Sequence, residues 1–470
     1  MDEISFFSAT ELTAAYAAKT LSPVEAARSA LSAIARHDGR LNAFRLFDET
    51  AALDAARQSE ARWQRGQPLS PIDGVPASVK DLLLTKGWPT LRGSLNVDPD
   101  QPWEEDAPAV ARLREAGAVL LGKTNTPEFG WKGTTDSPLA GITRNPWNPD
   151  MTPGGSSGGA AAALASGMGA LALGTDGGGS IRIPSSFSGL CGLKPTFGRV
   201  PAYPPSPAGT LANVGPMARS VPDLALMMNV IAKPDARDWL SLPHNATDYR
   251  SRLDEGVAGL RIAYSPDLGF AKVDAEVARH VASAAQIFSG LGAIVEEIDP
   301  GVGDCAEVFY THWHVALAGA FGDLPPERLD LMDPGLLDLV MTGKAIPIGM
   351  FIEAQNERIA LGRQMRMFYE TYDLLILPST AVAAFPVGRG APKGMDDKDW
   401  AAWTPFTYPF NLTMQPAASV PAGLTDAGLP VGLQIVGGMY ADDLVLRAAR
   451  AFENATPFGD QLSVTHVLSH

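Results

Sequence analysis

The pattern of apolar and polar positions divides the chain into a helical opening and a longer part built from short apolar runs. Residues 8–65 read as helices. Ser22-Pro23-Val24-Glu25 forms a capping box with proline at the first helical position, which predicts a helix to about Arg36. A second helix is expected over residues 48–65, where alanines give it a small-residue face. These helices carry no candidate chemistry.

From Pro71 onward, short apolar runs alternate with helical patterns. Strands are expected at 75–79, 118–123, 171–173, 260–264 and 374–378, and helices at 107–116, 275–291 and 443–452. This alternation indicates an α/β fold with a buried sheet. The sequence has no internal repeat and no low-complexity linker, and the proline-rich stretch 201–207 reads as a loop inside the domain. We therefore expect an N-terminal helical segment, residues 1–65, that packs on one large domain, residues 66–465.

Composition narrows the possible functions. The 470 residues are 46% hydrophobic, enough for a large core, and the formal net charge of −15 without a Lys/Arg stripe argues against nucleic-acid binding. The two cysteines, Cys191 and Cys305, imply no disulfide framework, and Cys191 reads as a small buried apolar residue. No signal peptide is visible, and the longest apolar run, 160–173, is too short to cross a bilayer. We expect a soluble, cytoplasmic protein that binds no membrane.

Two Gly/Ser loops, residues 154–159 and 177–180, are joined by an alanine-rich segment. Glycine tolerates positive φ and allows close approach of the backbone, so paired loops beside serines are typical of turns around a small reacting group. Successive N–H groups in such a turn can point at one spot, which is the geometry of an oxyanion hole. One such loop alone would usually be a flexible linker.

The block GGSSGG…GTDGGGSIRIPSSFSGLCGLKPTFGR, within residues 154–199, together with Lys80 in GVPASVKD, resembles the amidase signature hydrolases. Weaker matches at Asn145-Pro146-Trp147 and residues 429–434 extend the resemblance from about residue 8 to about 455. It implies a single large amidase signature domain with a mixed β-sheet core covered by helices on both faces. The signature core would span about 71–200, and a variable region at about 232–394 would help to shape the pocket. A homodimer is a further expectation from the family.

Amide hydrolysis by serine needs a base, and the usual base is histidine. None of the seven histidines lies near the Gly/Ser loops in sequence, although proximity in space stays open, so a Ser–Lys variant is more economical. By resemblance, Ser180 is the nucleophile, Ser156 is a bridging serine on a cis peptide, and Lys80 is the base. Lys80 follows an apolar run, where burial would lower its pKa and allow a neutral amine to accept a proton.

The resemblance also assigns supporting residues. The N–H groups of Gly177, Gly178, Gly179 and Ser180 would line the oxyanion hole, and Gly130 with Trp131 would form a flat apolar slot for the substrate. The alternative for Trp131 is a core position, as for most large aromatic residues. Ser157, Thr175 and Arg182 are expected to support the catalytic groups and Asp176 to be structural; the alternative for these four is ordinary loop hydrogen bonding.

Two rival interpretations fit less well. Residues 167–172 match G-x-G-x-x-A but follow a helix-like run instead of a strand, and no Gly-Lys-Ser/Thr follows them. His312 and His314 could bind a metal, but no Asp or Glu at helical spacing completes a site. We expect no metal and no cofactor.

The sequence therefore predicts an amidohydrolase that cleaves small aryl or hydrophobic amides through an acyl-enzyme on Ser180. The alternative is the glutaminase-like A subunit of a tRNA-dependent amidotransferase; a degenerate binding homologue is a third possibility, opposed by the intact Lys80, Ser156 and Ser180. Residues 128–136 contain Gly-Trp-Lys-Gly instead of the pattern expected in such an amidotransferase. This difference favours a free-standing hydrolase.

Overall fold

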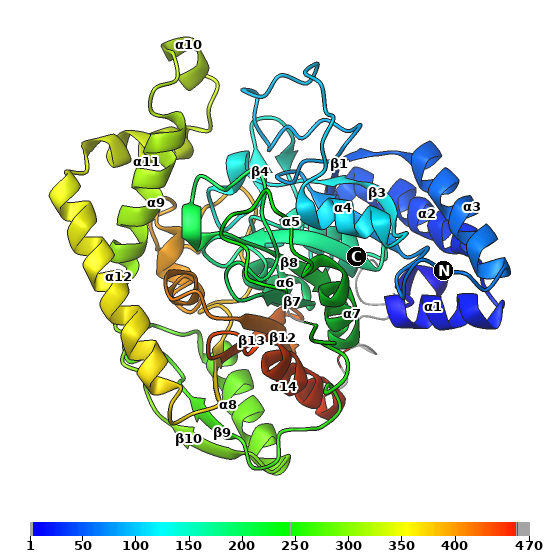
Figure 1. Cartoon of the computed structure of the whole chain (residues 1–470). Helices are drawn as coiled ribbons and strands as arrows, with labels where there is room; N and C mark the ends of the chain where they lie inside the picture. The colour runs from blue at the N-terminus through cyan, green and yellow to red at the C-terminus, as the bar shows by residue number, and fades with distance from the viewer. Residues whose placement is uncertain (1–2, 245, 457, 459–470) are drawn as a thin grey trace.

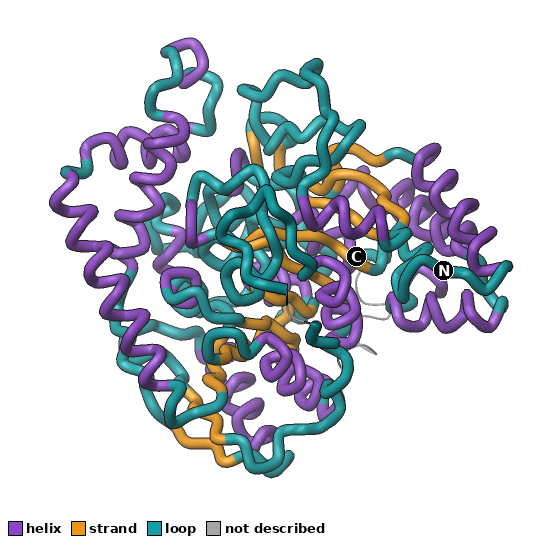
Figure 2. Tube along the Cα trace, in the orientation of Figure 1, coloured by secondary structure: helices purple, strands orange, loops and turns teal. Residues whose placement is uncertain are grey.

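The computed structural model describes residues 3–244, 246–456 and 458. Within these residues, eleven strands form one sheet in the order β1-β3-β2-β6-β8-β7-β12-β13-β11-β9-β10, and β4 and β5 form a separate pair. Helices flank the large sheet along its whole length (Figures 1 and 2). The expected mixed α/β fold in a single large domain is confirmed.

The strands are β1 (Phe44–Phe47), β2 (Pro76–Lys80), β3 (Val119–Thr124), β4 (Asp136–Ser137), β5 (Gly141–Ile142), β6 (Leu171–Asp176), β7 (Cys191–Lys194), β8 (Asn213–Ala218), β9 (Arg261–Tyr264), β10 (Ile294–Glu297), β11 (Leu374–Pro378), β12 (Ala417–Leu424) and β13 (Pro430–Gly437). The α-helices are α1 (Ala9–Ala18), α2 (Pro23–Leu41), α3 (Glu49–Gln64), α4 (Pro108–Glu115), α5 (Gly158–Ala165), α6 (Arg182–Ser188), α7 (Val221–Ile231), α8 (Ala275–Gly290), α9 (Ala306–Phe321), α10 (Pro326–Leu329), α11 (Pro334–Ala345), α12 (Ile348–Phe368), α13 (Pro409–Leu412) and α14 (Asp442–Ala455). Short 3-10 helices are η1 (Glu3–Phe6), η2 (Glu128–Gly130), η3 (Gly209–Leu211) and η4 (Trp400–Trp403).

The two faces of the sheet pack on different helices. On β13, Leu433 and Ile435 belong to the large apolar cluster shared with α7, α8 and α14. Gly432, which precedes Leu433, approaches α6 so closely that a Cβ would lie 2.5 Å from Ser186 Oγ. Because neighbouring residues of a strand point to opposite faces, one face packs on α7, α8 and α14 and the other on the small residues of α5 and α6. Around β11, this other face packs on an apolar cluster that includes α9, α11 and α12. The second face is where the two Gly/Ser loops lie.

The N-terminal helices pack on one end of the sheet, at the right of Figure 1. Val24 and Ile34 of α2 share an apolar cluster with Val119 and Leu121 of β3. The expectation that residues 8–65 are helical throughout is wrong at β1, which pairs antiparallel with β3 and lies between α2 and α3 in the chain. Four residues are too few to show a clear alternation, and the backbone of β3 supplies the hydrogen bonds that make this segment a strand.

Among the described residues, no single helix is long and apolar enough to cross a membrane. The helices α11 and α12 meet those criteria of length and composition only as a pair, and they are bent by 100° at the break between them.

Candidate active site

Two adjacent parallel strands bring the predicted base to the Gly/Ser loops. Lys80 is the last residue of β2, which pairs in parallel with β6, and β6 ends at Thr175 and Asp176. The carboxyl ends of parallel neighbours meet at one edge of a sheet, which is where such sheets place their functional groups. The loop 177–180 follows β6 directly, and the loop 154–157 precedes α5 at the same edge.

The side-chain nitrogen of Lys80 lies among three hydroxyl groups. Its Nζ is 2.8 Å from Ser156 Oγ, 2.9 Å from Ser157 Oγ and 2.9 Å from Thr175 Oγ1. The side chain is fully buried. Burial lowers the pKa of Lys80 well below its usual value near 10.5, and the negative charge of Asp176 opposes this shift only in part. The surroundings therefore favour a neutral amine.

The hydrogen bonds around Lys80 fit that neutral form. The Ser157 hydroxyl donates to the backbone oxygen of Thr175 at 3.2 Å, so it accepts a hydrogen bond from Lys80. A neutral amine has two N–H groups, which Ser157 and Thr175 can accept, and one lone pair. That lone pair is then free for the remaining neighbour, the hydroxyl of Ser156. Ser157 and Thr175 thus lie where they can orient the amine.

Both predicted catalytic serines line one cavity. The peptide bond between Gly155 and Ser156 is cis, as the resemblance implies. The backbone N–H of Ser157 donates to the carbonyl oxygen of Ser180 at 3.1 Å, which ties the two loops together. Within the described part of the chain, the Ser180 hydroxyl makes no hydrogen bond, so the proton path from Ser180 to Ser156 belongs to the proposal below.

Asp176 and Arg182 form a fully buried ion pair beneath the second loop. The carboxylate oxygens lie 2.9 Å and 3.0 Å from the Arg182 guanidinium, which holds the pKa of Asp176 below its usual range. Arg182 also donates to the side-chain oxygens of Gln434, at 2.8 Å, and Asn411, at 2.6 Å. Buried charges need such saturated surroundings. The pair therefore fixes the loop to the C-terminal part of the chain, and the structural role expected of Asp176 agrees with this geometry.

The glycine turn contributes free N–H groups, but fewer than expected. The N–H of Gly179 donates to Asp176 Oδ1 at 2.7 Å, so this group is already engaged. The N–H groups of Gly177, Gly178 and Ser180 donate to no protein acceptor among the described residues. Aromatic rings cover the turn: a Cβ on Gly178 would lie 2.6 Å from Trp400 and 2.8 Å from Phe309. Glycine is required here because no side chain fits beneath these rings.

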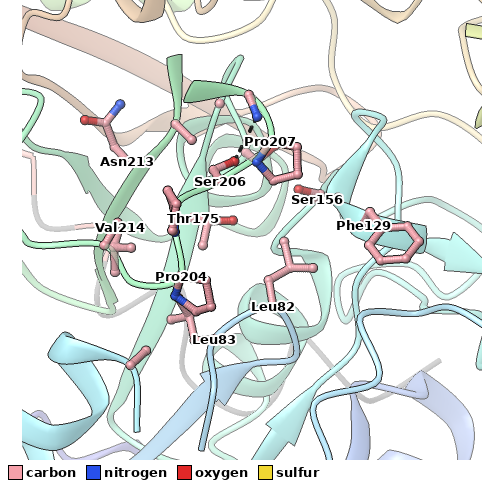
Figure 3. Close-up of a pocket in the computed structure, with 18 of the residues that line it drawn as sticks. Leu82, Leu83, Phe129, Ser156, Thr175, Pro204, Ser206, Pro207, Asn213 and Val214 are labelled. Atoms are coloured by element: carbon pink, nitrogen blue, oxygen red, sulfur yellow. Dashed lines mark hydrogen bonds between the residues drawn. The ribbon is translucent and has the colours of Figure 1, made fainter. Parts of the chain in front are cut away.

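The cavity beside the serines has a volume of about 120 Å³, and its lining is mainly apolar (Figure 3). Gly130 adjoins it with φ +75°, and a Cβ there would lie 2.9 Å from Leu82 and 3.1 Å from Ser156 Oγ. The absent side chain thus leaves open the space next to Ser156. The residues that line the cavity are Leu82, Leu83, Arg92, Ala107, Ala109, Phe129, Gly130, Ser156, Thr175, Gly177, Ser180, residues 201–208, Ala212, Asn213, Val214 and Trp313.

The expectation that Trp131 lines this cavity does not agree with the structure. Trp131 is 4% exposed and packs on α11, where a Cβ on Gly335 would lie 2.6 Å from its ring. Phe129, two residues earlier, lines the cavity instead. Phe129 and Gly130 both have positive φ, so the backbone reverses between the two aromatic side chains and sends them to different places.

The structure also places the histidine and cysteine residues considered above and the cavity residues that were not predicted. His312 lies on α9 with its ring between Val308 O and Gln355 Oε1, and no group of described residues could hold a metal ion. Cys191 is buried, and burial raises the pKa of its thiol. The cavity residues Arg92, Phe129 and Trp313 were missed because they lie in separate segments without a motif. Only the excess of proline at 201–207 marked a loop that proves to face the cavity.

Comparison with known proteins identifies the family. The Amidase family model matches residues 25–446. The chain is 38% identical to an acylamidase from Rhodococcus erythropolis, covering 97% of both chains, and 34% identical to the A subunit of a glutamyl-tRNA(Gln) amidotransferase from Chloroflexus aurantiacus, covering 98% of this chain and 99% of that one. It superposes on the crystal structure of a bacterial aryl acylamidase of the amidase signature family with a TM-score of 0.92, 32% identity and 99% of both chains covered. The chain therefore belongs to the amidase signature family and is an amide-hydrolysing enzyme of that family.

Proposed function

We propose that the chain hydrolyses carboxylic amides with an aryl or other apolar group through an acyl-enzyme on Ser180. The observation that carries the proposal is the buried, desolvated Lys80, 2.8 Å from Ser156 Oγ, at the edge of an apolar cavity that also holds Ser180. Supporting it are the similar acylamidase and aryl acylamidase described above. The proposal assigns Lys80, Ser156 and Ser180 as a catalytic triad without a metal or cofactor.

In this mechanism, Ser180 Oγ attacks the amide carbonyl carbon. The Ser180 proton passes to Ser156 Oγ while Ser156 gives its own proton to the lone pair of Lys80. The tetrahedral oxyanion accepts hydrogen bonds from the unengaged N–H groups of the glycine turn, each contributing about 2.7–4 kcal/mol. The same path in reverse protonates the departing amine or ammonia as the C–N bond breaks. Water then attacks the acyl-enzyme and gives a proton along the same path to Lys80. The proton returns to Ser180 Oγ as the ester bond breaks, and the carboxylic acid is released.

Apolar substrates are proposed because of the residues that surround the serines. Leu82, Leu83, Phe129 and Trp313 come from three separate segments to line the cavity. Contact with such walls favours the binding of an apolar group, whereas an acetamide-sized molecule has too little apolar surface to benefit. The aryl preference is thus assigned to Phe129 and Trp313 instead of Trp131.

The test is covalent labelling of Ser180. A neutral fluorophosphonate should attach to Ser180 in the native chain, as read by peptide mass spectrometry, and labelling should disappear in Ser180→Ala. Ser206→Ala, which changes another serine of the cavity, is the matched control and should still be labelled at Ser180. Labelling that persists at the same site in Ser180→Ala, or hydrolysis of anilides by that variant at the native rate, would contradict the proposal.

A second candidate is the glutaminase component of an amidotransferase, favoured by the 34% identity to the amidotransferase chain from Chloroflexus aurantiacus over 98% of this chain. The two candidates differ in their need for partners. The purified chain alone should hydrolyse acetanilide-type amides at least about tenfold faster than glutamine, in kcat/KM, if it is the free-standing hydrolase. If the chain hydrolyses glutamine but no anilide, and does so only after partner proteins are added, this ranking is reversed.

A further inference from the structure

The substrate cavity contains one charged side chain that the triad does not use. Arg92 lines the cavity with Ser156 and Ser180. None of the other described residues around this cavity carries a side chain that is charged at neutral pH. The cavity therefore holds one fixed positive charge and no negative one, although the chain as a whole has a net charge of −15.

The guanidinium of Arg92 has no protein partner. Within the described residues, it makes no hydrogen bond and lies within 4.0 Å of no carboxylate. The carboxylate of Asp81 acts on the guanidinium electrostatically, but Arg45 and Lys123 each lie 3.6 Å from that carboxylate. Burial lowers the pKa of Arg92, which shows that its charge is partly removed from water. A guanidinium in this position has five N–H donors available for a ligand.

The backbone holds Arg92 in place on both sides. Its N–H donates to Asp81 Oδ2 at 3.0 Å, and its carbonyl oxygen accepts from the N–H of Phe129 at 2.8 Å. Its φ of +57° is rare for a residue with a side chain. The segment is therefore anchored to the end of β2 and to the turn that carries Phe129, and both anchors adjoin the cavity.

We propose that Arg92 binds a carboxylate of the substrate, so that the preferred amides carry an apolar body and an anionic end. This inference rests on the proposed amidase function and names its substrate class more closely. Arginine suits the task because its planar fork donates to both oxygens of a carboxylate at once, and hydrogen bonds to charged groups are among the stronger ones. The apolar walls then hold the part of the substrate between the carboxylate and the amide.

Binding measured without catalysis tests the inference independently of the mechanism. In the Ser180→Ala chain, 3-phenylpropionate should bind at least about tenfold more tightly than 3-phenylpropan-1-ol, as measured by calorimetry. Adding Arg92→Met should remove this preference, and Arg92→Lys should restore part of it. Arg45→Met is the matched control, since Arg45 shares Asp81 with Arg92 but lies outside the cavity lining, and the preference should persist. Equal binding of the two ligands by the Ser180→Ala chain, or a preference that survives Arg92→Met, would overturn the inference.

Turnover then tells which end of the substrate Arg92 binds. Succinanilate carries its carboxylate on the acyl side and is compared with butyranilide; 4-acetamidobenzoate carries it on the amine side and is compared with acetanilide. One of the two carboxylates should raise kcat/KM by about tenfold or more in the native chain, mainly through KM, and Arg92→Met should abolish that ratio. If Ser180 is labelled and neutral anilides are hydrolysed but neither carboxylate is preferred, the amidase function stands and the role of Arg92 is wrong.

Discussion

The loops within residues 154–182 and the helices within residues 306–368 meet at the same cavity but contribute to it differently. The loops bring buried polar groups into hydrogen-bond contact: Lys80 reaches Ser156, Ser157 and Thr175 at 2.8–2.9 Å. From the variable region expected at 232–394, Trp313 on α9 is the sole described residue in the lining. Most of the wall comes from segments around Leu82, Phe129 and the loop 201–208.

The difference separates the requirements of chemistry from those of packing. A proton path tolerates errors of a few tenths of an ångström at most, so it needs particular residues at particular positions. An apolar wall requires only shape and volume, which many sequences can supply. The loops therefore show a motif, whereas α9 and its neighbours look like ordinary helices. The predictions below test this division, beginning with the largest effect.

Lys80→Met should lower kcat for an anilide by about 10²–10⁴-fold, the range expected for loss of a general base. Because the proposed proton path runs through both Lys80 and Ser156, the double variant Lys80→Met/Ser156→Ala should lose far less than the product of the two single losses. Steady-state kinetics on the four chains, with circular dichroism to verify folding, makes this check. Multiplicative losses would mean that the two residues act separately.

Asp176→Asn should destabilise the fold by about 3–5 kcal/mol, because it leaves the buried Arg182 without its countercharge. The control is Arg57→Gln, which breaks an exposed pair with Asp54 and should cost at most about 1 kcal/mol. Urea unfolding of both variants measures the difference. Similar small losses would show that the loop is held mainly by its packing.

The two tryptophans should separate specificity from stability. Trp313→Ala opens the cavity wall and should reduce the ratio of kcat/KM for an aryl amide over acetamide by about 10-fold or more, within the 1–3 kcal/mol that such contacts supply. Trp131→Ala should leave this ratio within about threefold of native but lower the free energy of unfolding by about 3–5 kcal/mol, as expected for a buried aromatic side chain. The reverse pattern would restore Trp131 as the pocket residue.

The pH dependence of kcat/KM should follow Lys80. Burial lowers its pKa from about 10.5, and the neutral amine is the active form in the proposed mechanism. Activity should therefore be constant above the lowered pKa and fall as the pH drops through it. Asp176 raises the pKa of Lys80, so Asp176→Asn should move this acidic limb to lower pH. Initial rates on a neutral anilide across a pH series, within the range where both chains stay folded, measure the shift. A limb that moves upward would contradict the assignment of Lys80 as the base.

The sequence predicted the polar centre better than its walls, for reasons visible in the residues. Lys80, Ser156, Ser157 and Thr175 could be grouped because the family's motif fixes them, and the structure does bring them together. Phe129 and Trp131 could not be told apart, since the positive φ of Phe129 is not readable from its side chain. The sequence also could not show that the Gly179 N–H donates to the Asp176 carboxylate, because a side chain of the protein there takes the place of the substrate oxygen as acceptor.

The fold was predicted in part. The strands at 75–79, 118–123 and 374–378 were found within a residue or two, while β1, β7, β8, β10 and the pair β12–β13 were not predicted. β12 contains Pro421 and Gly423 at a register shift, which breaks the alternation that would reveal a strand. The boundary at residue 65, the homodimer and the cytoplasmic location remain predictions.

The buried ion pair of Asp176 and Arg182 also sets an order of events during synthesis. Asn411, which accepts a hydrogen bond from Arg182, lies 229 residues later in the chain. At about 5–20 residues per second, the ribosome delivers it about 10–50 seconds after the loop has emerged. The strands β12 and β13, which separate β7 from β11 in the sheet, arrive at the same late stage. The nascent chain therefore carries all three members of the proposed triad before Asn411 is available to complete the hydrogen bonds of Arg182. A fragment released early would contain the sequence motif without the contacts that hold its second loop in place.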